Sequence, residues 1–156
     1  IRNFILPIAF SKFNKVSTET IINFARLYID SAQQLLKSNP FACMQYIYPK
    51  EYGAVNIYSH VSTETNDKMA KLMEQLIIEG YENNKIPIDI ESAEMWMSGN
   101  MPKLEKYVPY FNLADLTSAE DYKMHCDFTI QTYSLILNED KEVAGNILRF
   151  VFSLLT

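Results

Sequence analysis

Hydrophobic residues recur at three- and four-residue steps along several stretches of the chain, with polar residues between them. The stretches run from about 17 to 37, 63 to 83, 117 to 137 and 138 to 155. This spacing puts the apolar side chains on one side of an α-helix, because a helix completes a turn every 3.6 residues. The pattern predicts three to four long amphipathic helices that bury their apolar sides against one another.

Residues that favour helix starts lie at the beginning of these stretches. Ser17 and Asn138 are suitable N-caps, and Thr117 and Glu120 have the spacing of a capping box. The pentapeptide Val-Ser-Thr-Glu-Thr occurs at 16–20 and again at 61–65, where the first two long helices begin. Internal duplication and shared capping chemistry both explain this repeat. We prefer capping chemistry, because the two helices diverge beyond the five matching residues.

The segments between the long helices predict several short ones, at 41–48, 89–96 and 102–108, since Pro40 and Pro102 suit the first position of a helix. Residues 50–60 are the least helical, and the alternation of Val55 and Ile57 allows a short strand there. We expect an all-α, orthogonal or irregular bundle that forms a single domain over residues 1–156, with the apolar segment 1–14 docked on it.

Composition and charge narrow the class of partner. The chain has 156 residues, of which 48% are hydrophobic and 13% aromatic, as in globular proteins. A formal net charge of −5 argues against binding to nucleic acid or to anionic membrane surfaces, both of which require clustered cations. The longest apolar run, residues 4–10, is far shorter than the ~20 residues of a membrane-spanning helix. We expect a soluble protein, either cytoplasmic or periplasmic.

The residues that could carry out chemistry are few. The chain contains two histidines, His60 and His125, and two cysteines, Cys43 and Cys126, and none of them has the close spacing of metal-ligand pairs. No glycine-rich phosphate loop or nucleophile motif is found. The sequence therefore predicts no metal site and no cofactor, and it predicts that the protein is not an enzyme.

Cys126 nevertheless has alternative interpretations. It follows His125, and Asp121 lies one helical turn earlier, so an enzyme or toxin fragment could use Cys126 as a nucleophile. We prefer a buried Cys126 beside a surface His125, because neighbouring helical residues point about 100° apart. Cys43 and Cys126 are either two separately buried thiols or, in an exported protein, a disulfide pair.

Two segments are candidate contact surfaces. The first contains the only tryptophan together with three methionines, namely Met95, Trp96, Met97 and Met101. Tryptophan and methionine are enriched at protein interfaces, although they also fill cores. The second segment contains clustered tyrosines, whose rings bury while their hydroxyls need partners: Tyr46, Tyr48, Tyr52 and Tyr58.

An acidic helical surface of this kind suits a basic partner protein. In composition, as a small acidic helical chain without a catalytic constellation, it is similar to bacterial immunity proteins and to small inhibitor or adaptor domains. The resemblance implies a non-enzymatic protein-binding domain. Two alternatives stay open: the enzyme or toxin fragment that uses Cys126 and His125, and a structural helical part of a larger assembly, suggested by the absence of an initial methionine. The identity of the partner and the oligomeric state are undecided.

Overall fold

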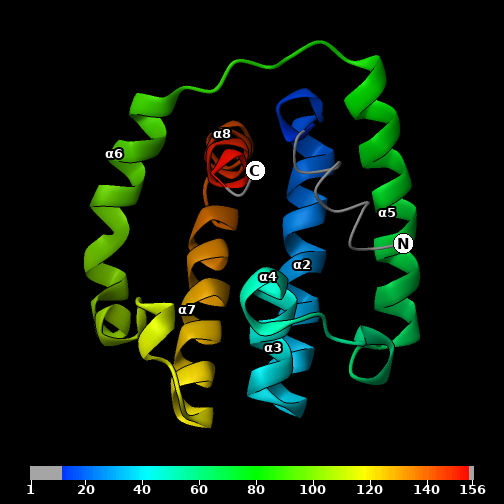
Figure 1. Cartoon of the computed structure of the whole chain (residues 1–156). Helices are drawn as coiled ribbons and strands as arrows, with labels where there is room; N and C mark the ends of the chain where they lie inside the picture. Colours follow the sequence, from blue (N-terminus) through cyan, green and yellow to red (C-terminus); the bar gives the residue numbers. More distant parts are fainter. Residues whose placement is uncertain (1–11, 155–156) are drawn as a thin grey trace.

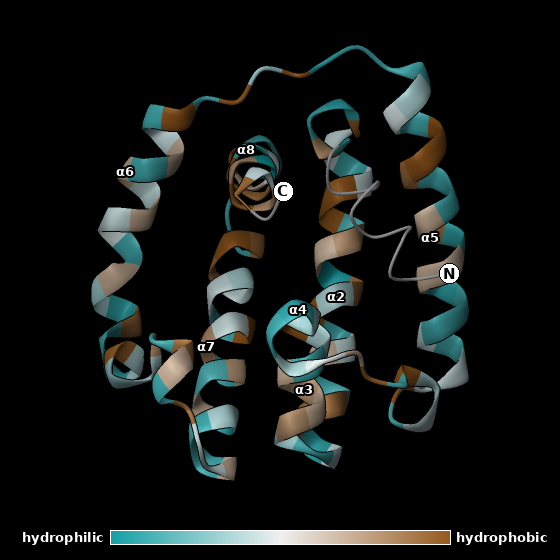
Figure 2. Cartoon of the chain, in the orientation of Figure 1, coloured by the Kyte–Doolittle hydropathy of each residue, from teal (hydrophilic) through white to brown (hydrophobic). Residues whose placement is uncertain are grey.

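The stripe predicted near residues 17–37 forms the central helix of the bundle. The computed structural model describes residues 12–154, and in it α2 (Thr18–Ser38) contacts four other helices. These are α3 (Pro40–Ile47), α5 (Thr63–Glu82), α7 (Ala119–Leu137) and α8 (Lys141–Ser153). Hydrophilic and hydrophobic residues alternate along α2 and α5 (Figure 2). The burial pattern of α5 has one buried side and one solvent side, as the periodicity predicts.

The remaining elements connect and cover these helices. They are α4 (Pro49–Tyr52), α6 (Ile90–Asn100) and the 3₁₀ helices η1 (Phe13–Lys15), η2 (Ile57–Ser59), η3 (Met101–Tyr110) and η4 (Leu113–Asp115). α5 and α6 lie at opposite sides of the bundle, joined by the segment between them, which crosses one end (Figure 1). Over residues 12–154 the fold contains no strand, so the all-α prediction is confirmed.

Buried side chains form two clusters. The first includes Phe13, Phe24 and Phe152, whose rings contact one another in stacked, tilted and edge-on pairs where η1, α2 and α8 meet. The second lies between α2, α3 and α7 and contains Cys43 and Cys126. We expected the segment 1–14 to dock on the domain; residues 1–11 of it lie outside the described residues, and Phe13 belongs to the first cluster.

The repeated pentapeptide caps both long helices in the same way. Ser17 accepts a hydrogen bond from the backbone N–H of Thr20, and Ser62 accepts one from the backbone N–H of Thr65. Each threonine hydroxyl then donates to a carboxylate on the other helix: Thr20 to Glu79 and Thr65 to Asp30. The N-cap function of these serines is confirmed, and the two threonine contacts link α2 and α5 as an antiparallel pair.

Three local predictions were wrong. Residues 50–60 form α4 and η2 instead of a strand, because Pro49 starts a helical turn and Asn56 caps another. The capping box of α7 consists of Ser118 and Asp121 instead of Thr117 and Glu120. Asn138 ends α7, and α8 begins after Asp140. Both misplaced caps are off by one or two residues, in runs where neighbouring polar residues suit the same position.

Candidate functional site

α6 is attached to the bundle by polar contacts at its first residues. The Asp89 side chain caps the helix by accepting the N–H of Ser92 at 3.0 Å. The backbone of Asp89 also exchanges two hydrogen bonds with the side-chain amide of Asn146 on α8, each 2.8 Å long. The start of α6 is therefore fixed to α8.

Trp96 attaches the middle of α6. Its ring packs against the first core cluster, and its indole N–H donates to a carboxylate oxygen of Glu139 at 2.8 Å. A half-buried tryptophan with its donor satisfied holds the helix in one orientation. The sequence allowed two interpretations of the segment 95–101, a contact surface or part of the core. Trp96 packs against the core.

The opposite face of α6 is turned to solvent. The helix buries only Ala93 and Asn100 of its 11 residues. Positions 91, 94, 95 and 98 share one side of a helix by their spacing, and all four are exposed. Met95 is 69% exposed, one helical turn after Glu91 and next to Glu94 in sequence. An apolar, flexible side chain thus lies among carboxylates on a helix that the bundle holds in place.

The other members of this segment lie near that face. Ile90, at the start of α6, is 54% exposed, and Met101, where α6 passes into η3, is 36% exposed. Met97 is half-buried. We call the exposed set Ile90, Glu91, Glu94 and Met95 the α6 surface. The two glutamates were not among the predicted contact residues, although the four-residue steps from Glu91 to Met95 and from Glu94 to Ser98 place them on one side of the helix.

The tyrosine segment lies mostly inside the packing. Tyr46 stacks on Tyr28 with ring centroids 5.1 Å apart, and the Tyr52 hydroxyl donates to the backbone oxygen of Leu113 at 2.9 Å. The Tyr48 hydroxyl contacts His125. Tyr58 alone of the four predicted tyrosines is largely exposed, at 72%. The structure therefore separates Tyr58 from the other three instead of gathering all four on one surface.

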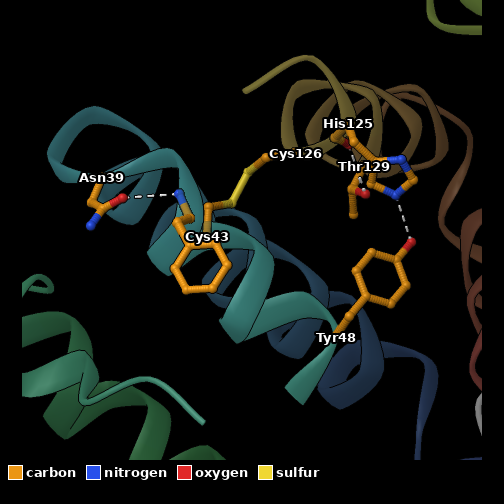
Figure 3. The surroundings of a disulfide bond; sticks show 7 residues. Asn39, Cys43, Tyr48, His125, Cys126 and Thr129 are labelled. Atoms are coloured by element: carbon orange, nitrogen blue, oxygen red, sulfur yellow. Dashed lines mark hydrogen bonds between the residues drawn. A yellow bond between two sulfur atoms is a disulfide. The ribbon is translucent and has the colours of Figure 1, made fainter. Parts of the chain in front are cut away.

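His125 and Cys126 are both buried, and Figure 3 shows the contact of His125 with Tyr48 and the bond of Cys126 to Cys43. Cys126 on α7 forms a disulfide with Cys43 on α3, with the two Cα atoms 6.3 Å apart. Of the two alternatives raised for the cysteines, the structure contains the disulfide. A sulfur in a disulfide is not a thiolate, and the thiolate is the form that attacks substrates.

His125 is 3% exposed, so the expectation of a surface histidine was wrong. Its Nδ1 lies 2.6 Å from the backbone oxygen of Tyr110, which can only accept, so Nδ1 carries the proton. Nε2 then accepts from the Tyr48 hydroxyl at 2.9 Å. Burial lowers the pKa of His125, although the contact with Tyr110 opposes this. Asp121 caps α7 and does not orient His125.

Other site chemistry is sparse in the described part of the chain. Residues 12–154 contain no group of three histidine, cysteine or acidic side chains that could hold a metal ion. None of the described helices combines the length and apolar content needed to cross a membrane. Of the predicted contact residues, Tyr58 and Met95 are the most exposed, at 72% and 69%, and of these two only Met95 lies on an α-helix.

Comparison with known proteins gives no relative from which a function could be transferred. No protein-family model, no curated protein and no solved structure matches the chain. The functional argument therefore depends on the geometry of the chain itself.

Proposed function

We propose that the chain is a non-enzymatic protein-binding domain that binds a basic partner protein through the α6 surface. The observation that supports this proposal most directly is Met95, 69% exposed on a helix that buries only two of its residues. A helix that contributes so little to the core of the bundle has an outer face available for another molecule.

The chemistry of the α6 surface suggests the class of partner. Met95 has a flexible, polarisable side chain that adapts to an apolar pocket. Glu91, one turn before Met95, and Glu94 are exposed on the same helix and would pair with lysine or arginine side chains around such a pocket. The formal net charge of −5 would also speed the encounter with a basic protein. We therefore expect the partner protein to have a small apolar pocket surrounded by lysine or arginine side chains.

The contacts behind α6 favour binding with little ordering cost. Trp96 and Glu139 hold the middle of the helix, and Asp89 and Asn146 hold its start. A surface that is already in its bound conformation loses less conformational entropy on association. The proposal thus describes a preformed surface, of the kind used by inhibitor and adaptor domains. An immunity-type inhibitor would suppress its partner's activity, whereas an adaptor would leave that activity unchanged.

The test is affinity capture from cells that produce the protein, with variants that change only the exposed face. We expect a stoichiometric protein of net positive charge, whose recovery falls about tenfold or more with Met95→Ala combined with Glu94→Lys, the size of effect of a central contact residue. The matched control is Ile78→Ala combined with Glu74→Lys, which makes the same type of change on the exposed face of α5.

Equal loss in both double variants would attribute binding to overall charge and contradict the proposal. An acidic partner, or full recovery with the α6 variant, would contradict it as well. Once the partner is known, adding the wild-type domain to an assay of that partner's activity separates an inhibitor from an adaptor.

A further inference from the structure

A groove of about 450 Å³ runs between α2 and α5. From α2 it is lined by Asn23, Arg26 and Leu27. From α5 it is lined by Lys68, Lys71 and Leu72, with Gln75 at the next turn. We call it the α2–α5 groove. Because α5 and α6 lie at opposite sides of the bundle (Figure 1), it is separate from the α6 surface.

The charge of this groove is opposite to that of the whole chain. Three of its lining residues are cations, Arg26, Lys68 and Lys71, and none is a carboxylate. The neighbouring cavity, of about 290 Å³, is balanced, since Glu19 and Glu139 line it together with Arg26 and Lys141. Positive charge concentrated in one groove of an acidic protein favours the binding of an anion there.

The ion pairs of the described residues leave most of this charge uncompensated. Lys68 pairs with Glu64 at 2.6 Å. Within residues 12–154, Arg26 and Lys71 take part in no ion pair. They stand on the two helices that flank the groove, Arg26 on α2 and Lys71 on α5. An anion bound in the groove is therefore attracted by a cation on each of the two helices.

The groove also offers an apolar contact. Leu72 is buried in the first core cluster, and Leu27 packs against the same cluster, yet both line the groove. The groove volume lies within the range of small-molecule sites, about 300–1,000 Å³. A ligand with a charged end and a small apolar part would use both kinds of lining.

We propose that the α2–α5 groove binds a small organic anion. Its phosphate or carboxylate group contacts Arg26 and Lys71, and its apolar part lies against Leu27 and Leu72. The planar guanidinium of Arg26 can donate two parallel hydrogen bonds to either type of anion, while Lys71 supplies a point charge. This site does not depend on the α6 surface, so one can be correct without the other.

The test is a titration of the intact protein followed by NMR of its backbone amides. The probes are phenyl phosphate and benzoate, with phenol as the neutral probe and inorganic phosphate as the anion without an apolar part. We expect phenyl phosphate or benzoate to shift amide signals confined to residues 23–27 and 68–75. The tighter of the two identifies the preferred anion. Phenol and inorganic phosphate are each expected to bind at least about fivefold more weakly.

Variants identify the residues that bind the anion. Arg26→Gln combined with Lys71→Gln is expected to weaken the tighter probe about tenfold or more. The control, Lys37→Gln combined with Lys50→Gln, removes two exposed cations outside the groove and is expected to change affinity less than twofold. Equal weakening in both variants, or shifts scattered over the surface, would overturn the proposal. Tighter binding of a hexaglutamate peptide than of either aryl probe would overturn its small-molecule part.

Discussion

The hydroxyl of Thr20, in the first turn of α2, donates a 2.7 Å hydrogen bond to the Glu79 carboxylate in the last turn of α5. Glu79 also accepts the backbone N–H of Ser17 at 2.8 Å and the side-chain amide of Gln75 at 3.0 Å. At the other end of the helix pair, Thr65 donates to Asp30 at 3.1 Å, and Gln34 donates to Thr65. Two similar polar clusters thus join α2 and α5.

The substitution Glu79→Gln tests the first of these clusters. The amide retains one oxygen acceptor but loses the charge, and a hydrogen bond to a charged group is worth about 1.5–3 kcal/mol when its partner is lost. Because Glu79 is only half-buried, we expect a smaller loss, about 1 kcal/mol in the free energy of unfolding measured with urea. Glu74→Gln, on the exposed side of α5, is the control and is expected to change it by less than about 0.5 kcal/mol.

The same carboxylate predicts a pH dependence. Burial raises the pKa of Glu79, but the hydrogen bonds from Ser17, Thr20 and Gln75 outweigh it and hold the pKa below the ordinary value of 4.5. Such a group stabilises the fold fully above the unfolded-state pKa, and this contribution is lost as the pH falls through the folded-state pKa. We expect wild-type stability to fall more steeply below about pH 4.5 than that of Glu79→Gln. Parallel curves would contradict this assignment.

The Cys43–Cys126 disulfide predicts a large response to reduction. It joins residues 83 positions apart, and closing a loop of that size removes about 4 kcal/mol of unfolded-state entropy in the chain model. We expect the free energy of unfolding to fall by about 3–4 kcal/mol in the presence of a thiol reductant. The control is the double variant Cys43→Ala and Cys126→Ala, whose urea midpoint should not respond to reductant. An equal response in both proteins would attribute the effect to something other than the disulfide.

The positions of the long helices could be predicted from the sequence, because apolar residues at three- and four-residue steps mark the side of a helix that is buried. The caps could be predicted only approximately, because Thr117 and Ser118 are adjacent and chemically alike and the N-cap is Ser118. The burial of His125 could not be predicted, because its partners Tyr48 and Tyr110 come from distant segments. The α2–α5 groove likewise exists only once Arg26 and Lys71 stand on packed neighbouring helices.

Two glycines in helices should respond oppositely to the same substitution. A Cβ at Gly99 in α6 would meet none of the described heavy atoms within 4 Å, so Gly99→Ala should gain helix propensity and stabilise the fold by about 0.5 kcal/mol. A Cβ at Gly145 in α8 would lie 2.7 Å from Cγ2 of Thr18, where α8 meets the start of α2. We expect Gly145→Ala to destabilise by about 1–2 kcal/mol in urea unfolding. A stabilised Gly145→Ala variant would contradict the close contact between these helices.

The buried imidazole of His125 predicts a second pH dependence. Its pKa is lowered, first by burial, so the folded state binds fewer protons than the unfolded state just below the ordinary value of 6.5. The stabilisation by the neutral ring is therefore complete above pH 6.5 and is lost as the pH falls through the folded-state pKa. We expect unfolding free energies to decrease between about pH 6.5 and 5 in the wild type and to be flatter in His125→Gln.

Tyr48→Phe tests the hydrogen bond between the Tyr48 hydroxyl and this buried ring. Removing the hydroxyl leaves Nε2 of His125 without its 2.9 Å donor in a buried site, which costs about 1–2 kcal/mol at pH 7.5. Tyr81→Phe makes the same chemical change at a 65% exposed tyrosine and is expected to be nearly neutral. Because protonated Nε2 no longer needs a donor, the gap between wild type and Tyr48→Phe should narrow as the pH is lowered. A gap that stays constant down to pH 5 would mean that the hydroxyl stabilises the fold without favouring the neutral ring.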